Sequence, residues 1–302
     1  MYPLIEVLCY IFVLIDTDDT YLSRNKAASM VVDLHSHTTY SDGELAVSEL
    51  LEHARNHGVE VFSITDHDCI EAYRDIESDV GMRIIPGVEI SCQLDGKELH
   101  LVGLGIDLAN PQLNQLINNN QMLRKERAEW IVARLQKLKY PDISQSLDQQ
   151  VTGDVICRTH LAKALVSEGL ARDFQTAFKR FIGRSGKAWK RAGWPAMTEV
   201  IDVVHAAGGF VILAHPTKYR YSSGKLTLII EEFARDGGDA IEINYSGLNL
   251  NHKTWLKRLA RNNGLMVSVG SDFHHLGQTW AVPGKFSQID SELTPVWSQF
   301  QL

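Results

Sequence analysis

Histidine and carboxylate side chains recur at the ends of short apolar runs in this chain. The first run ends in Asp33-Leu34-His35-Ser36-His37, and because strand side chains alternate between faces, His35 and His37 share one face. A single buried histidine is usually a packed core residue, but five such strand ends argue against that interpretation. The other candidates follow the first strand or end the later ones: Asp42, His67, Glu89, His215, Asp272 and His274.

His100 joins this set through a predicted hairpin. Asp95-Gly96 is a strong two-residue turn signal between two apolar runs. With that turn, residue 91 faces residue 100, and Glu89 becomes a diagonal neighbour of His100 on the same face, within reach of one cation.

Imidazole and carboxylate ligands without thiolate suit Mn²⁺, Fe²⁺ or Zn²⁺. Crowded carboxylates repel one another unless cations separate them, so we expect two or three divalent ions per chain, Mn²⁺ first, with Glu89 as a bridge. Two metals can generate a hydroxide and clamp both the attacking and the leaving oxygen of a phosphoryl displacement. The residues therefore predict a metal-dependent phosphoesterase. Four histidines in helical patterns keep a structural interpretation: His53, His57, His205 and His252.

Short β-branched runs alternate with helical patterns, which is typical of a parallel sheet or barrel with its active site at the carboxyl ends of the strands. The predicted strands are 31–36, 59–65, 83–91, 98–106, 209–214, 240–245 and 265–270. The predicted helices include 47–57, 197–207, 226–236 and 253–262, and glycine follows most of them, as helix C-caps require.

Between Asn110 and Lys190 the strand signal fails and the pattern is helical, which predicts a helical subdomain inserted between the fourth and fifth strands. Residues 112–191 hold 15 Lys+Arg against 7 Asp+Glu, whereas the remainder holds 15 against 30. A basic insert in an acidic body suits phosphates in one part and metals in the other. The alternative is that the positive charge of residues 112–191 is only the solvent-exposed face of ordinary helices.

The composition, with 44% hydrophobic and 22% charged residues, is that of a soluble globular protein. Its four cysteines form no C-x-x-C pair, which favours reduced thiols and a cytoplasmic location. The apolar run 4–15 is too short to span a membrane and contains Glu6. We therefore divide the chain into a dispensable extension (1–29), a barrel (30–110 and 191–302) and a basic helical insert (111–190).

Five motifs together resemble the PHP (polymerase and histidinol phosphatase) superfamily, over about residues 30–288. They are His35-Ser36-His37, Thr65-Asp66-His67, Pro86-Gly87-Val88-Glu89, Ala214-His215-Pro216 and Gly270-Ser271-Asp272-Phe273-His274. The insert, with Cys157-Arg158-Thr159-His160, is similar to the bacterial YciV/TrpH branch. Members of that branch act as 3′,5′-nucleoside bisphosphate phosphatases and as 5′-to-3′ exoribonucleases on short RNA and ribosomal RNA 5′ ends.

The resemblance implies a distorted (β/α)₇ barrel and a trinuclear centre. One metal would take His35, His37, Glu89 and Asp272. A second would share Glu89 and take His100 and His215. A third would take Asp42, His67 and His274.

The insert supplies the candidate substrate contacts. We expect Arg158 and His160 to point at the cluster and bind a substrate phosphate, the alternative being a helix-start arginine and a packed histidine. Trp189 and Trp194 lie among basic residues and could stack a base, or simply pack at an interface.

The predicted reaction is release of the 3′-phosphate from a nucleoside bisphosphate, or stepwise trimming of 5′-phosphorylated RNA. One rival is another small-molecule phosphatase, such as one for histidinol phosphate, which would not need so basic an insert. A second is a metal-bound, non-catalytic module, which would be expected to have lost ligands. No membrane or protein partner is predicted.

Overall fold

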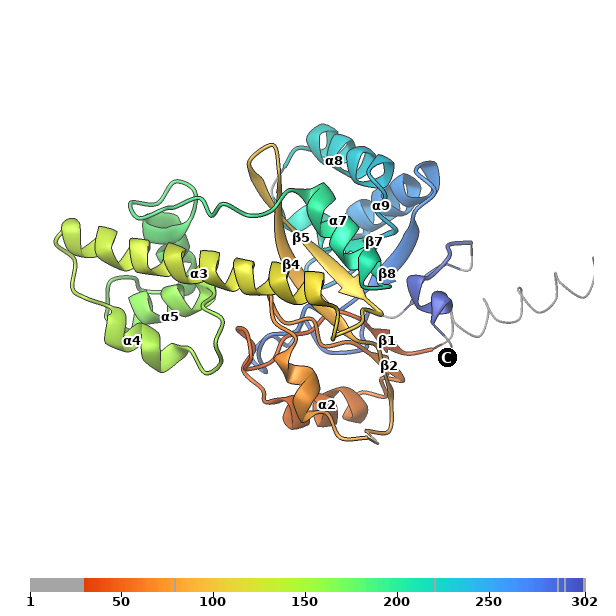
Figure 1. The fold of residues 1–302 in the computed structure, drawn as a ribbon, viewed down its shortest axis with the longest axis horizontal. Coiled ribbons are helices and arrows are strands. Elements are labelled where there is room, and N and C mark those ends of the chain that lie inside the picture. The colour runs from red at the N-terminus through yellow and green to blue at the C-terminus, as the bar shows by residue number, and fades with distance from the viewer. Residues whose placement is uncertain (1–29, 79, 220, 287, 291, 301–302) are drawn as a thin grey trace, which may run out of the picture.

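The structure, a computed structural model, describes residues 30–78, 80–219, 221–286, 288–290 and 292–300 (Figure 1). The predicted extension 1–29 lies outside the described residues, so its dispensability stays a prediction. None of the described helices is long and apolar enough to cross a membrane.

The strands form two sheets. A three-stranded parallel sheet has the order β1-β2-β3, and a five-stranded mixed sheet has the order β4-β5-β6-β7-β8. Their bounds are β1 Val32–Asp33, β2 Val61–Phe62, β3 Arg83–Ile84, β4 Gly87–Leu94, β5 Lys97–Leu104, β6 Phe210–Leu213, β7 Ala240–Asn244 and β8 Met266–Val269. Each predicted strand therefore exists, although β1 and β2 are much shorter than expected.

The predicted strand 83–91 divides at Ile85-Pro86. Proline has no N–H to donate to a ladder, and the chain changes sheets there. Before the break β3 pairs with β2, and after it β4 pairs with β5. The hydroxyl of Tyr73 accepts the Gly87 N–H at 2.6 Å, which satisfies that donor at the changeover.

The predicted distorted (β/α)₇ barrel is confirmed only in part: the fold is mixed α/β, but its described sheets are not closed into a barrel. The described strands form no continuous ring, and β5 runs antiparallel to both β4 and β6. Isolated bridges, Ser36 to Phe273 and His67 to Glu89, link the two sheets instead. The physical reason is that two-residue strands leave their ladders early, so the following residues turn into loops. The bridged residues are candidate ligands or their neighbours in sequence, and the loops after the short strands bring these ligands together.

The predicted hairpin is confirmed in its register. Ser91 pairs with His100 across β4 and β5, and the two-residue turn is Asp95-Gly96. Both turn residues have positive φ, 51° and 68°, which is the backbone of a type I′ turn. Glu89 and His100 consequently lie on one face of the hairpin.

Helices cover the five-stranded sheet and build the insert (Figure 1). Helix α7 packs on β4 and β6, and α9 packs on β7 and β8. The helices are α2 Val47–Asn56, α3 Pro111–Lys137, α4 Ser144–Gln150, α5 Arg158–Ser167, α6 Phe174–Ala177, α7 Met197–Ala206, α8 Ser223–Arg235 and α9 Leu250–Asn262. A π-helical turn, η2, covers Phe178–Ile182, and 3₁₀ turns cover Glu71–Asp75 (η1), Pro216–Tyr219 (η3) and Val296–Gln299 (η4).

The inserted segment has a hydrophobic core of its own. Helix α3 begins with Pro111 at its first position and with the Asn110 side chain accepting two backbone N–H groups, and it then extends away from the sheets (Figure 1). Its far half packs with α4, α5 and η2 through buried residues that include Ile131, Leu165 and Phe181. The insert is therefore helical, as expected.

Gly270, directly after β8, allows the chain to pass close to the candidate ligand His35. A Cβ atom there would lie 2.3 Å from the His35 Cβ and 2.8 Å from its backbone nitrogen. We expect Gly270→Ala to lower the free energy of unfolding by about 1–3 kcal/mol, as overpacking of a tight core does. Gly224→Ala is the control, because a Cβ there meets nothing within 4 Å. Equal thermal midpoints for the two variants would contradict the proposed crowding.

Candidate metal centre

The nine candidate ligands converge where the two sheets meet. Their donor atoms form four overlapping groups, and within each group the atoms lie within 4.8 Å of one another. The groups are His37, Asp42, His67 and His274; His35, His37 and Glu89; His35, His215 and Asp272; and His67, Glu89 and His100. Every residue predicted as a metal ligand is therefore in the cluster, and the overlap indicates several neighbouring ions.

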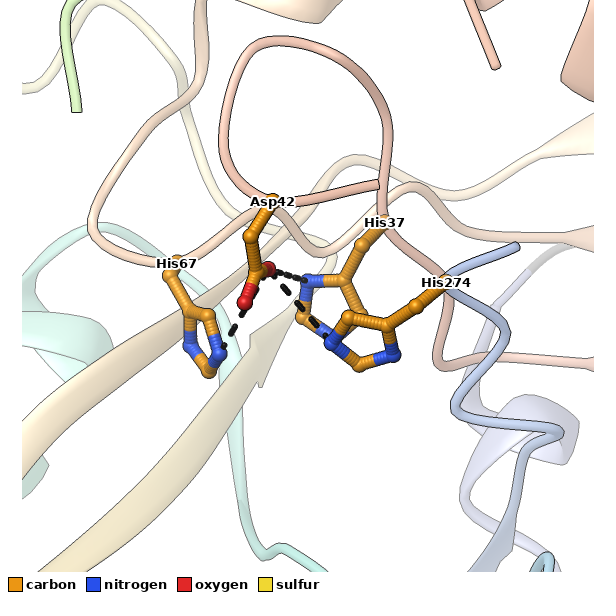
Figure 2. Close-up of side chains that lie close together, drawn as sticks. All are labelled: His37, Asp42, His67 and His274. Atoms are coloured by element: carbon orange, nitrogen blue, oxygen red, sulfur yellow. Dashed lines mark ion pairs between the residues drawn. The ribbon is translucent and has the colours of Figure 1, made fainter. Parts of the chain in front are cut away.

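Asp42 is the centre of the group that contains His37, His67 and His274. Figure 2 shows three imidazoles pointing at its carboxylate. Its Oδ1 atom lies 3.4 Å from His274 Nε2, 3.9 Å from His67 Nε2 and 4.0 Å from His37 Nδ1. Asp66 holds the loop that carries Asp42, because its carboxylate accepts hydrogen bonds from the hydroxyls and backbone of that loop. His37 joins this group, which the resemblance did not imply.

Glu89 occupies the middle of the cluster and is fully buried. Its Oε1 atom lies 2.9 Å from His100 Nδ1 and 2.8 Å from His215 Nε2. Its Oε2 atom lies 2.9 Å from His67 Nδ1 and 3.3 Å from His35 Nε2. Because its two oxygens face different imidazoles, this carboxylate has the geometry of a bridge between cation positions.

Asp272 completes the cluster on the β8 side. Its Oδ1 atom lies 3.2 Å from His37 Nε2 and 3.5 Å from His35 Nε2, while its Oδ2 atom bonds the Lys218 ammonium. Asp272 has a φ of 53° and His215 one of 29°, values that side-chain-bearing residues seldom adopt. The backbone is thus strained at two candidate ligands, as it often is at functional sites.

Cations fit this arrangement of atoms. Six of the nine ligands have a buried nitrogen or oxygen with no hydrogen-bond partner: His35 Nε2, His37 Nδ1, Asp42 Oδ1, His67 Nδ1, Glu89 Oε2 and His215 Nδ1. Buried polar atoms are seldom left unpaired, because each costs about 1–3 kcal/mol. These six atoms lie close together without hydrogen bonds, and coordination to metal ions would satisfy them.

The charges within the cluster favour the same conclusion. Burial raises the pKa of the Glu89 carboxyl, but the positive charge of neighbouring imidazoles, His67 first, outweighs burial and holds that pKa well below its ordinary value. Burial lowers the pKa of His100, yet Glu89 raises it to about 9. The buried carboxylates are therefore ionised and attract protons onto imidazoles, protons that a bound metal would displace.

Several residues that surround the cluster were not identified as functional by the sequence analysis. Glu242 in β7 bonds His35, and Asp33 in β1 accepts the backbone N–H groups of His35 and Ser271. Asp68, next to His67, is fully buried. Glu242 is the only acidic residue in its own predicted strand, 240–245, and this was the signal in the sequence that could have identified it.

A buried polar network ties helix α3 to the cluster. The Arg124 Nε atom donates to Asp68 Oδ2 at 2.7 Å, and its Nη2 atom donates to the Ser91 hydroxyl at 2.8 Å. Asn120 donates to the other Asp68 oxygen at 2.7 Å. Helix α3 therefore fixes the loop after His67 as well as supporting the insert.

A cavity of about 1010 Å³ lies between the hairpin, the insert and the cluster. His100 and His215 line its inner end. Its cationic lining consists of Lys97, Arg158, Lys179, Arg184, Arg191 and Lys218, and its aromatic lining of Phe174, Phe178, Trp189, Trp194, Tyr219 and Tyr221. The cavity is basic and aromatic, and it lies beside the cluster of candidate metal ligands. This lining suits a ligand that carries both a phosphate and a flat ring.

The two predicted substrate contacts differ in position. Arg158 lines the cavity and donates to Glu98 at 2.9 Å. His160 is buried, and its Nδ1 atom accepts the Cys157 N–H at the start of α5. That nitrogen is therefore used within the helix. Trp194 lines the cavity but is 3% exposed.

The bridging position of Glu89 can be tested by substitution. In Glu89→Gln an amide NH₂ replaces one carboxylate oxygen, so the bridge loses its charge and one of its metal-facing acceptors. We expect fewer metal ions per purified chain and reduced phosphoesterase activity. Elemental analysis checks this, with the exposed Glu52→Gln on α2 as the control. Full metal content with unchanged turnover would reject the bridging role.

Comparisons with known proteins agree with this geometry. A family model described as "PHP domain" matches residues 33–245. A 5′-3′ exoribonuclease of Haemophilus influenzae is 35% identical over 271 residues, which cover 89% of this chain and 98% of that protein. A 3′,5′-nucleoside bisphosphate phosphatase of Chromobacterium violaceum is 28% identical over 277 residues, covering 89% and 96%.

The fold is also found in a solved structure. An amidohydrolase from Chromobacterium violaceum, determined with bound sulfate and no metal, superimposes with a TM-score of 0.83 at 28% identity, covering 89% of this chain and 95% of that one. The family model matches most of the chain, so this chain belongs to the PHP domain family.

Proposed function

We propose that this chain is a metal-dependent hydrolase of phosphate esters in nucleotides, acting on 3′,5′-nucleoside bisphosphates and on the 5′ end of 5′-phosphorylated RNA. The observation that carries the proposal is the position of the basic, aromatic cavity directly beside His100 and His215. The names of the two relatives support it, since one is an exoribonuclease and the other a nucleoside bisphosphate phosphatase. Maturation of ribosomal RNA 5′ ends is the corresponding cellular role.

The residues that would hold the metals are the nine of the cluster. We assign His35, His37, Glu89 and Asp272 to one ion, Glu89, His100 and His215 to a second, and Asp42, His67 and His274 to a third. Mn²⁺ is our first choice for a set of imidazoles and carboxylates, ahead of Fe²⁺ or Zn²⁺. The ions would supply an activated water and stabilise charge on the phosphoryl oxygens.

The protein's own groups would bind and orient the substrate. Arg158 presents a planar guanidinium to the cavity and suits a phosphate that is not being cleaved. Arg127 lies behind it, 97% buried, with an Nη1 atom that makes no hydrogen bond and lies 3.5 Å from Glu98. Trp189 is only partly buried in the cavity wall and is positioned to stack a base.

The proposal favours nucleotides over a small sugar or amino-alcohol phosphate. Six cationic and six aromatic side chains line the cavity, among the described residues, against the single carboxylate of Glu98. Its volume is at the upper end of the range for small-molecule sites. We infer that the basic insert, residues 111–190, anchors the substrate while the remaining chain carries the metal centre.

Arg158→Ala tests the anchoring role. Loss of one charge-assisted contact of about 1.5–3 kcal/mol should raise the KM for adenosine 3′,5′-bisphosphate roughly 10–100-fold, with a smaller effect on p-nitrophenyl phosphate. Steady-state kinetics on both substrates with added Mn²⁺ measure this. Arg172→Ala, an exposed arginine of the same insert, is the matched control. Equal losses on the two substrates would refute the anchor.

The end of the RNA chain gives a second test. A 5′-phosphate supplies two negative charges near the basic wall and a 5′-hydroxyl supplies none, so 5′-phosphorylated RNA should be degraded clearly faster, with stepwise release of 5′-mononucleotides. Circular RNA should be untouched. A time course on end-labelled oligonucleotides measures both. Internal fragments at early times, or equal rates with and without the 5′-phosphate, would leave only the broader phosphoesterase proposal.

A further inference from the structure

Glu242 is a buried carboxylate that the cluster of candidate ligands does not include. It stands in the middle of β7 between Ile241 and Ile243, and 1% of its surface is exposed. Burying a carboxylate in an apolar strand costs free energy unless its oxygens accept hydrogen bonds or face positive charge. Its partners therefore explain why an acid occupies this position.

Both oxygens of Glu242 contact candidate ligands. The Oε1 atom lies 2.7 Å from His35 Nδ1. The Oε2 atom accepts the backbone N–H of His215 at 2.5 Å. One carboxylate thus joins ligands from the ends of two strands, β1 and β6, that are remote in sequence.

The contact with His35 fixes the chemistry of that ring. An ionised carboxylate accepts hydrogen bonds only, so Nδ1 must carry a proton, and Nε2 is the ring atom that remains for a metal. Nε2 is the atom that faces Glu89 and Asp272, at 3.3 and 3.5 Å, and it is one of the buried atoms without a hydrogen bond. A metal-binding histidine requires this tautomer when Nε2 is the ligand.

The contact with His215 fixes its backbone. His215 has a φ of 29°, a conformation that must be held by its surroundings. The Oε2 atom binds the N–H of this same residue, while the ring Nε2 atom lies 2.8 Å from Glu89. The direction of the His215 ring therefore depends on Glu242.

We propose that Glu242 is a positioning residue of the metal centre, which sets the tautomer of His35 and the backbone of His215 at once. The inference rests on the proposed function only for the presence of metal. Glu242→Gln separates its two roles, because an amide has one accepting oxygen and one donating NH₂. That variant cannot accept from both His35 and His215.

The chain provides a matched control in Asp239. Its Oδ2 atom lies 2.8 Å from His205 Nε2 and accepts the Val211 N–H at 2.7 Å. Asp239 therefore also joins a histidine ring to a β6 backbone N–H, but His205 lies outside the cluster. Asp239→Asn removes a carboxylate charge beside the same kinds of partner without touching a candidate ligand.

The experiment measures Mn²⁺ affinity of the wild-type chain, Glu242→Gln and Asp239→Asn by competition with a chelator, without substrate. We expect Glu242→Gln to bind Mn²⁺ about 10–100-fold more weakly and Asp239→Asn to be unchanged. Nitrogen-15 NMR of the chain loaded with diamagnetic Zn²⁺ should show the His35 proton on Nδ1, and a shifted His35 signal in Glu242→Gln.

Wild-type affinity and an unshifted His35 signal in Glu242→Gln would overturn the proposal, as would equal losses in both variants. If Glu242→Gln does not fold, Glu242→Asp keeps the charge but withdraws the oxygens by one methylene, and it should lose affinity as well. Wild-type affinity in Glu242→Asp would then overturn the proposal. Metal binding that depends on Glu242 in a chain inactive on phosphate esters would reject the proposed function alone.

Discussion

The arrangement of this molecule depends on the repulsion among carboxylates that are buried side by side. Glu89, Asp42 and Asp272 lie in one cluster, and each is less than a tenth exposed. Such charges are stable inside a protein only when positive charge lies between them. Imidazoles face every one of these carboxylates, and six ligand atoms remain without hydrogen bonds, so the local geometry is arranged around cation positions.

The short strands follow from that requirement. A long ladder would point alternate side chains to opposite faces, whereas the cluster needs neighbouring residues to turn toward one centre. Strands β1 and β2 accordingly end after two residues, and single bridges at Ser36 and His67 hold the loops that follow. Positive φ values at His215 and Asp272 are the local cost, and the hydrogen bonds of Glu242 and of the Lys218 ammonium offset it.

The convergence of the nine candidate ligands could be predicted from the sequence because they belong to local motifs. His100 required one longer step, and the Asp95-Gly96 turn supplied it because a two-residue turn fixes the register. Glu242 could not be found in this way, since its partners come from β1 and β6 and depend on the pairing of β7 with β6. The barrel was predicted correctly only in part for a related reason: apolar runs mark where strands lie but not how soon their ladders end. For His160, sequence spacing could not show that one ring nitrogen would bind the start of its own helix.

The separation of charge within the fold constrains where a substrate can react. The cluster is rich in ionised carboxylates and would hold divalent cations, whereas the neighbouring cavity wall is cationic through Arg158, Arg191 and Lys218. A ligand with one phosphate can satisfy either region alone. A ligand with two phosphates can satisfy both at once, one at the cluster beside His100 and His215 and one at the basic wall. Two separated phosphates occur in a nucleoside bisphosphate and at the 5′ end of a phosphorylated RNA. Under the proposed function, this geometry would let both proposed substrates share one site, and the phosphate at the wall would decide which ester bond lies at the cluster.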